Sequence, residues 1–116
     1  RLECMCQRLG IRSYSPLWHQ TPIEHIRGMI EAGFEIMLTS VSCDGLEHNW
    51  LGRVLDEKSL KELQELSTKH RFNVDGEGGE YETFVLGGPI WSRSLKIEGK
   101  EQHSASRGVF TIHSVV

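Results

Sequence analysis

The segment Phe34–Val41 constrains the fold of this chain more than any other part. It reads Phe-Glu-Ile-Met-Leu-Thr-Ser-Val, a nearly continuous apolar run, which is typical of a β-strand covered on both faces. Another short strand is predicted over Ile11–Trp18, and a helical pattern precedes each strand. Helices and strands that alternate at such short spacing favour a parallel sheet with crossover helices, and therefore an α/β chain.

Both predicted helices have clear local signals. The apolar stripe of the first consists of Leu2, Met5, Cys6 and Leu9. The second begins with Thr21, Pro22 and Glu24, the pattern of a capping box. Two strands do not make a stable sheet by themselves. We therefore expect that this chain is the back part of a longer protein, or that a partner supplies the missing layer.

The pattern changes after residue 42. An amphipathic helix is predicted over Glu57–His70, and strands are predicted over Thr83–Leu86, Ser94–Glu98 and Val109–Val116. The last two strands, joined by a polar loop, are expected to form an antiparallel hairpin. We predict two parts, residues 1–42 as the end of a parallel sheet and residues 43–116 as a small α+β domain.

Charge and hydropathy exclude several classes of function. The chain has 13 basic and 16 acidic residues and no basic run, so we expect no nucleic acid and no anionic membrane as partner. No apolar stretch approaches the length of a bilayer span, and the first residues do not resemble a signal peptide, which predicts a cytoplasmic protein. The three cysteines and six histidines lack metal-ligand spacing, so no protein metal site is predicted.

The most unusual stretch is Asp75–Thr83, with four carboxylates and three glycines in nine residues. Glycines allow positive φ and a close approach of the backbone to a ligand. Four negative charges oppose a bare phosphate, so a magnesium ion, a cationic substrate or an amine is the expected guest. The alternative is a solvated turn whose acids only keep an edge soluble.

A second candidate stretch, Gly45–Asp56, follows the carboxyl end of the strand at Phe34–Val41, where open α/β sheets place their ligands. Arg53 is predicted to pair with a carboxylate or phosphate, or alternatively to form a structural ion pair with Asp56 or Glu57. Trp50 is either a ligand wall or a core residue. Cys43 is either a reactive thiol or a small buried residue.

These residues resemble a known family. The run Gly76–Leu86, together with Gly45-Leu46, Trp50-Leu51-Gly52-Arg53 and Leu55-Asp56, is similar to the C-terminal half of the diphthine–ammonia ligases, and so are the Pro16-Leu17-Trp18 corner and Gly33–Met37. The resemblance implies that residues 1–42 end a Rossmann-like sheet of the adenine nucleotide α-hydrolase type. The Ser-Gly-Gly-Lys-Asp-Ser loop that grips ATP in that family is absent from this sequence.

The resemblance implies an enzyme, an ATP-dependent ligase that amidates diphthine on translation elongation factor 2. In this reaction ATP activates the diphthine carboxylate, and ammonia displaces AMP, with pyrophosphate as the other product. ATP and Mg²⁺ are the implied cofactors, and elongation factor 2 carrying diphthine and ammonia are the implied partners. This chain alone is expected to be inactive, because the ATP loop is missing.

The resemblance also implies site residues. The expected catalytic residues are Glu77, Glu80 and Glu82, as a negative field for trimethylammonium or Mg²⁺ or as a base for ammonium. The expected substrate-binding residues are Gly76, Gly78, Gly79, Tyr81, Thr83, Gly45, Trp50, Gly52 and Arg53. Tyr81 or Trp50 would stack on the cation, and Arg53 would face the carboxylate or pyrophosphate. In an extended strand Glu80 and Glu82 would point one way and Tyr81 the other.

Two other interpretations of the function stay open. The chain is alternatively a non-catalytic module that binds a partner through the acidic stretch, or part of an ATP-dependent ligase that acts on tRNA or a small molecule. An open sheet edge also predicts a homodimer.

Overall fold

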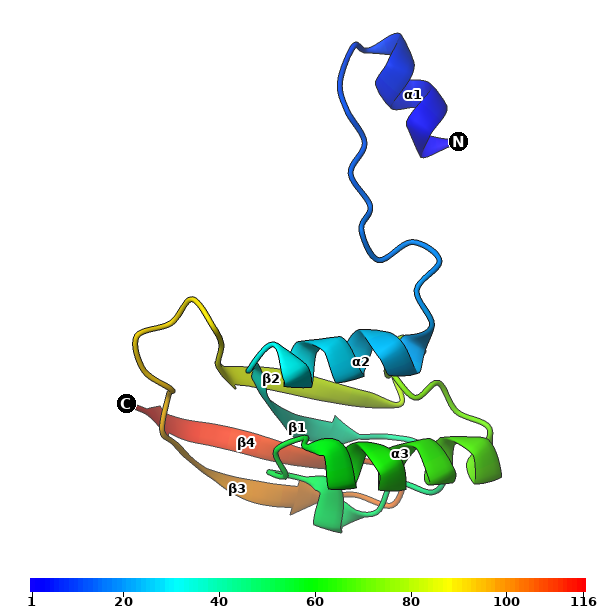
Figure 1. Ribbon diagram of the computed structural model, residues 1–116. Coiled ribbons are helices and arrows are strands. Elements are labelled where there is room, and N and C mark those ends of the chain that lie inside the picture. Colours follow the sequence, from blue (N-terminus) through cyan, green and yellow to red (C-terminus); the bar gives the residue numbers. More distant parts are fainter.

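Four strands form one antiparallel sheet with the order β2-β1-β4-β3 in a computed structural model that describes residues 1–116 (Figure 1). The elements in chain order are α1 (Leu2–Arg8), α2 (Pro22–Glu31), β1 (Glu35–Val41), the 3₁₀ helix η1 (His48–Trp50), α3 (Glu57–His70), β2 (Tyr81–Gly87), β3 (Ile97–His103) and β4 (Gly108–Val115). The α/β class is confirmed. The longest helix, α3, has 14 residues, and no helix combines the length and apolarity of a membrane span.

β1 is the organising strand of the sheet. It pairs with β2 along its whole length, from Glu35 opposite Gly87 to Val41 opposite Tyr81. Its other edge is shared: residues 52–55 bond to its first half, and β4 pairs only at Ser40 and Val41. Both neighbouring strands run antiparallel, so the parallel sheet predicted for the first third of the chain is not observed. The apolar run at residues 34–41 reports burial on both faces, and burial carries no information about strand direction.

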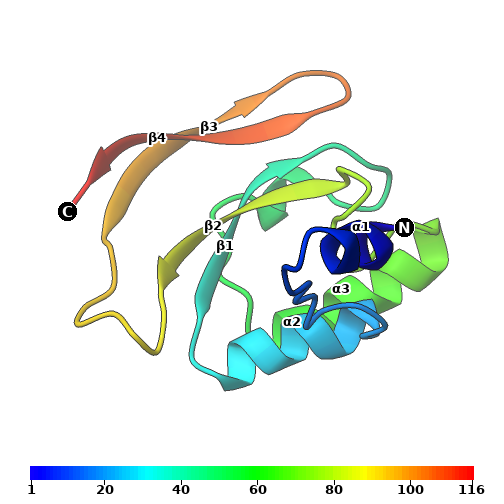
Figure 2. The same cartoon turned by 90° about the horizontal axis from the view of Figure 1, so that it is seen from above.

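The predicted strand at Ile11–Trp18 is wrong. These residues form no strand and are all exposed, because no neighbouring strand is there to pair with them. Together with α1 they make an arm, residues 1–20, that projects from the rest of the chain (Figures 1 and 2). The radius of gyration is 16.6 Å, whereas a compact chain of this length has about 13 Å. The helix α1 buries no residue.

The hydrophobic core lies between one face of the sheet and the helices α2 and α3 (Figure 2). Its fully buried members include Leu38 on β1 and Leu60 and Leu63 on α3. The predicted helix at Glu57–His70 is confirmed, and so is the antiparallel hairpin, in which β3 begins three residues later than the strand predicted from Ser94. β1 lies in the same sheet as β2 and β4; the division of the chain after residue 42 stays a prediction.

Candidate functional site

The acidic loop, residues 73–80, connects α3 to β2 through two successive turns. In these turns the Gly76 N–H donates to the Asn73 carbonyl (3.0 Å) and the Gly79 N–H donates to the Gly76 carbonyl (2.9 Å). Both glycines have positive φ, +72° and +86°, a conformation that other residues rarely adopt. The glycines of the motif are therefore required by the backbone path of the loop.

Glu80 holds this loop together from inside. Its Oε1 accepts hydrogen bonds from the backbone N–H of Asn73 (3.0 Å) and from the Asn73 side-chain amide (2.9 Å). Burial by itself raises the pKa of Glu80, but these donors and the nearby N–H groups of Glu80 and Gly78 outweigh it and keep the pKa below its usual value. The carboxylate is therefore charged, and its Oε1 is already engaged, whereas its buried Oε2 has no hydrogen-bond partner. Its predicted catalytic role stays a prediction.

Tyr81 anchors the same loop from below. Only 5% of the residue is exposed, and its hydroxyl donates to the Val74 carbonyl at 2.6 Å. A Cβ on Gly76 would lie 3.0 Å from the ring, so the loop packs directly on this aromatic face. Burial, with smaller effects from Asp75 and Glu80, raises the pKa of Tyr81. The ring is covered by its own protein, which leaves little of it for a ligand.

The acidic loop is also fastened to the end of β1. The hydroxyl of Ser42 donates to the Gly79 carbonyl (2.6 Å), and the Ser42 N–H donates to the Glu80 carbonyl (2.9 Å). With Glu80 and Tyr81 this makes three separate attachments, so the carboxylates that remain on the loop surface are held by a fixed backbone.

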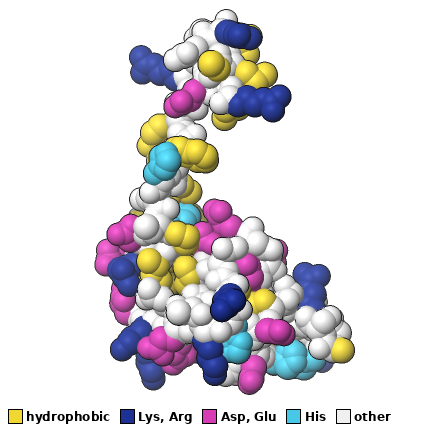
Figure 3. Space-filling view, turned by 90° about the vertical axis from the view of Figure 1, so that its right-hand side faces the viewer, with side chains coloured by type: hydrophobic (Ala, Val, Ile, Leu, Met, Phe, Trp, Pro, Cys, Tyr) yellow, Lys and Arg dark blue, Asp and Glu magenta, His cyan; other side chains and the backbone are white.

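Two of those carboxylates line a hollow of about 390 Å³, which we call the acidic cleft. Asp75 is half-buried and accepts the Glu77 N–H at 3.3 Å, and Glu77 is exposed. The opposite wall is the base of the arm and the start of α2, with Ser15, Leu17, Trp18, His19, Gln20, Pro22 and His25. Trp18 is 75% exposed, so its ring is available to a ligand. Figure 3 shows acidic side chains gathered where the arm meets the rest of the molecule.

Glu82 and Thr83 lie apart from the acidic cleft. Tyr81 and its partner Val41 belong to the core under the helices, so alternation along β2 directs Glu82 and its partner Ser40 to the opposite face of the sheet. Glu82 and Thr83 are both exposed. The structure therefore does not bring the three predicted catalytic glutamates together: Glu77 is in the cleft, Glu80 inside the loop and Glu82 on the open face.

The second predicted stretch is mainly scaffold. Trp50 is 3% exposed and belongs to the core. The Arg53 guanidinium lies 4.3 Å over its ring and pairs with Glu62 on α3 (Nη1 to Oε2, 2.6 Å). Arg53 thus forms a structural ion pair, as one of the two alternatives predicted, but the predicted partners Asp56 and Glu57 are wrong, because the partner is Glu62. Neither residue lines the acidic cleft.

The other glycines have local structural reasons. Gly45 has φ +96°, and a Cβ there would collide with the His70 ring. Gly52 has φ +73° and faces the ring of Phe110, 3.3 Å from an added Cβ. At Gly78 a Cβ would lie 2.5 Å from the Glu80 carboxylate. These positions shape the loops around the clefts; direct contact with a substrate stays a prediction.

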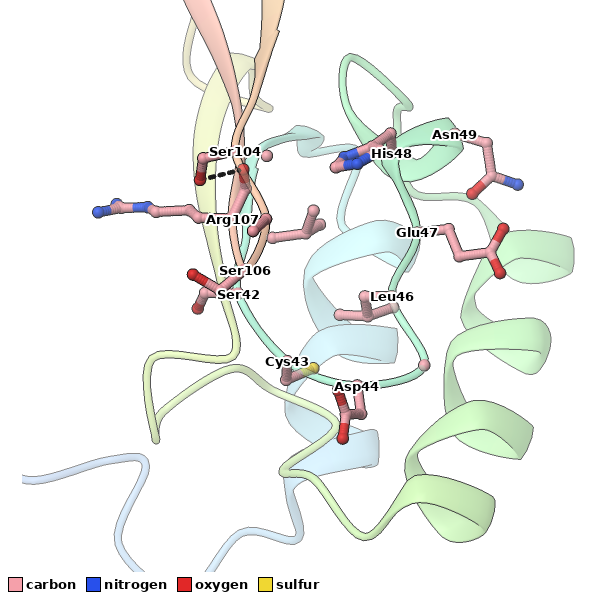
Figure 4. Close-up of a pocket in the computed structure, with 14 residues that line it drawn as sticks. Ser42, Cys43, Asp44, Leu46, Glu47, His48, Asn49, Ser104, Ser106 and Arg107 are labelled. Atoms are coloured by element: carbon pink, nitrogen blue, oxygen red, sulfur yellow. Dashed lines mark hydrogen bonds between the residues drawn. The ribbon is translucent and has the colours of Figure 1, made fainter.

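A larger hollow, about 550 Å³, lies between residues 41–49 and the turn at residues 104–108 (Figure 4). We call it the turn groove. Burial, then the charges of Glu80 and Asp44, raise the pKa of Cys43, so this thiol stays protonated and is a poor nucleophile.

Nowhere in the chain do three or more histidine, cysteine or acidic side chains form a group that could hold a metal ion.

Sequence reasoning missed Trp18, His25 and Asp75 as cleft residues, and it missed the turn groove. The similarity of Pro16-Leu17-Trp18 to the same family as the acidic stretch was the available signal, since these two segments form opposite walls of one cleft. One wall of the groove did have a signal, because Gly45–Asn49 belong to the second predicted stretch. The other wall, residues 104–108, had none, because it lies more than fifty residues further along the sequence.

Comparison with known proteins identifies the family of this chain. The chain is 36% identical over 108 residues to the diphthine–ammonia ligase of Homo sapiens, covering 90% of this chain and 40% of the human protein. It is 36% identical over 107 residues to that of Schizosaccharomyces pombe and 29% identical over 127 residues to that of Saccharomyces cerevisiae, in each case covering 90% of this chain and 18% of the relative. The chain thus spans two fifths or less of these relatives. Residues 21–116 match the family model described as diphthamide synthase C-terminal domain, and the chain therefore belongs to that family.

Proposed function

We propose that this chain is the C-terminal part of an ATP-dependent ligase that amidates diphthine on translation elongation factor 2, using ammonia and releasing AMP and pyrophosphate. Family membership and the names of the relatives support this reaction. The observation that carries it is the acidic cleft, which is lined both by Asp75 and Glu77 and by an exposed aromatic residue, Trp18.

The cleft suits an organic cation. A quaternary ammonium cannot donate hydrogen bonds, so it is recognised by aromatic faces and by diffuse negative charge. Trp18 supplies the aromatic face, and Asp75 and Glu77 supply the negative charge on a fixed loop. An aromatic wall suits this guest better than Mg²⁺, which prefers oxygen ligands all around it. We assign Glu77 and Trp18 to contact with the trimethylammonium group, and Glu80 and Tyr81 to positioning of the loop.

ATP does not fit the acidic cleft, because two carboxylates oppose a triphosphate. No step of the reaction is therefore assigned to a nucleotide or to Mg²⁺ at residues of this chain. We propose that both are held by a nucleotide-binding domain of the Rossmann type in the part of the relatives that this chain does not cover.

A cytoplasmic location is proposed with the function, since the acceptor is a translation factor. Homodimer formation through the outer strands β2 and β3 also stays a prediction.

The test uses the complete protein, with ammonia-dependent AMP formation on diphthine-bearing factor as the readout. Trp18→Ala is expected to raise KM for the factor about two- to fivefold, corresponding to loss of an exposed cation–π contact. Glu77→Gln is expected to raise it severalfold. Glu98→Gln, on an exposed glutamate of β3 outside the cleft, is the matched control and is expected to leave KM unchanged.

The same experiment separates the alternatives. Unchanged KM and kcat in both cleft variants would reject the acidic cleft as the cation site. If the complete protein bound the factor but formed no AMP, the chain would belong to a binding module. If AMP formation depended on tRNA or a small molecule instead of the factor, the acceptor would be wrong while the ligase chemistry stood.

A further inference from the structure

The loop that joins β2 to β3, residues 88–96, carries an inference that rests on the proposed function. We call it the distal loop, because the acidic loop ends where β2 begins and this loop starts where β2 ends. β2 has seven residues, and a strand rises about 3.4 Å per residue, so the two loops are about 20 Å apart. Figures 1 and 2 show the distal loop, in yellow, at the end of the sheet away from the arm.

The tip of the distal loop is apolar and open to solvent. It consists of Pro89, Ile90 and Trp91, which we call the apolar tip, and all three are exposed. Ile90 is 88% exposed and Trp91 is 42% exposed. Exposed apolar residues that are contiguous mark interaction sites more often than isolated ones do. Tryptophan is also among the residues that most often anchor protein interfaces.

The backbone of the distal loop is fixed although its tip is bare. At the start of the loop, the Trp91 N–H donates to the Gly88 carbonyl at 3.0 Å. Further along, the Ser94 hydroxyl donates to Oε1 of Glu35 on β1 at 2.6 Å. The tip is therefore the part of a closed turn that is held on both sides.

Two glycines let this loop lie directly on the body of the molecule. A Cβ on Gly87 would come within 2.6 Å of the Ser94 Oγ, and a Cβ on Gly88 within 2.9 Å of the Phe34 ring. The close fit at the base places the apolar tip before any partner arrives. Such preorganisation lowers the entropy that is lost when a partner binds.

The charge of the distal loop selects the kind of partner. Arg93 and Lys96 are the only charged residues in this loop, in a chain whose net charge is -3. Both are exposed, and neither belongs to an ion pair of the molecule. A second copy bound symmetrically through the same loop would bring like charges together. An apolar hollow with an acidic rim on another protein would complement both the tip and its flanks.

We propose that the apolar tip docks into an acidic-rimmed apolar hollow on the translation factor, away from the modified residue. One side chain cannot span the distance between the acidic loop and the tip, so the two sites hold different parts of a macromolecular substrate. The tip contributes to binding and has no part in the chemistry. Its loss should weaken binding whether or not the factor carries diphthine, and should leave turnover at saturation unchanged.

The test measures the Kd of the complete protein for two forms of the factor, one that carries diphthine and one that does not. Ile90→Ser is the principal variant, because a side chain that is 88% exposed makes few contacts within its own chain. It is expected to raise both Kd values about tenfold, for the loss of one buried aliphatic side chain, with kcat unchanged. Trp18→Ala in the acidic cleft should raise Kd only for the form that carries diphthine.

Val54→Ser and Lys58→Gln are the matched controls. Val54 is 41% exposed, as Trp91 is, and Lys58 is an exposed cation on α3. Neither residue lies in the distal loop or lines the acidic cleft, so both variants should bind like the wild type. Arg93→Gln is expected to raise both Kd values about threefold at low salt and less at high salt.

Three outcomes would overturn the proposal. If the wild type amidates the factor and Ile90→Ser binds like Val54→Ser, the tip is not the docking surface, and the proposed function stands. If Ile90→Ser raises Kd only for the form with diphthine, the tip acts at the modified residue and not away from it. If the wild type neither binds nor amidates the factor, the proposed function fails and the docking proposal fails with it.

Two other occupants of the tip would leave different signatures. A change from dimer to monomer in sedimentation of Ile90→Ser, with both Kd values unchanged, would identify a second copy. A midpoint of thermal unfolding that falls in the complete protein but not in the chain 1–116 would identify the remainder of the complete protein as the occupant. Either result would also count against docking on the factor.

Discussion

At the scale of single residues, a carboxylate's position along the motif decides its role. Glu77 and Glu80 are three residues apart in one acidic stretch, yet the first is exposed and lines the acidic cleft, and the second is turned inward onto Asn73. Composition predicted that the stretch attracts positive charge. It could not divide the acids into those that line the cleft and those that hold the loop, because that division depends on a backbone path set by Gly76, Gly79 and the buried Tyr81 ring.

The lowered pKa of Glu80 leads to a prediction about how the free energy of unfolding depends on pH. Its pKa is below the usual value in the folded chain, and an unfolded glutamate titrates near about 4.3. Its contribution is therefore complete above that pH and is lost as the pH falls through the folded pKa. Glu80→Gln is expected to lower the free energy of unfolding by about 1 kcal/mol at pH 7, the low end for such bonds because the loop is partly solvated.

The measurement is urea unfolding at several values between about pH 7 and pH 3. The difference between wild type and Glu80→Gln should shrink as the pH falls through this range, while Glu98→Gln should follow the wild type throughout. A constant difference at every pH would show that the charge of Glu80 does not hold the loop.

At the scale of elements, helices were predictable and strand directions were not. The start of α3 is encoded locally: Asp56 Oδ1 accepts the Ser59 N–H, and the Ser59 hydroxyl accepts the Asp56 N–H, both at 2.7 Å. β1 was recognised from its apolar run, but its antiparallel pairing depends on β2 and β4, which lie far along the chain. A pattern of burial says that a strand is covered, whereas its direction is set by the connections on both sides of it.

The two helix starts give a matched prediction. Asp56 caps α3 through the backbone, whereas the Thr21 hydroxyl at the start of α2 donates to the Glu24 side chain (2.5 Å) and caps no backbone group. Asp56→Ala is therefore expected to lower the unfolding midpoint by a few degrees, and Thr21→Ala by clearly less. Thermal unfolding followed by circular dichroism checks this; equal losses would mean that the capping bonds of Asp56 contribute nothing beyond helix preference.

At the scale of the whole molecule, the arm is set apart from the residues that form the core. Leu2, Met5 and Leu9 are each more than half exposed, and α1 buries nothing. The family model likewise begins at residue 21. The helical stripe at the start of the chain was visible in the sequence, but a stripe only marks an apolar side and could not show that none of its residues is buried.

Removing residues 1–20 is therefore expected to leave the folded body intact. The chain 21–116 should unfold cooperatively at the same midpoint as the chain 1–116 within about 2 °C, since no core residue is lost. Trypsin should cut the chain 1–116 first at Arg8 or Arg12, which lie in the arm. A large fall in midpoint, or first cleavage within residues 21–116, would show that the arm packs on the body.

The acidic cleft draws one wall from residues 15–20 and the other from the loop before β2. A boundary placed by sequence similarity at residue 21 thus separates residues 21–116 from one wall of the acidic cleft. Transplanting residues 21–116 into another protein would transfer the scaffold with only half of the cleft, and a chimera that is meant to keep the proposed cation site must include residues 15–20.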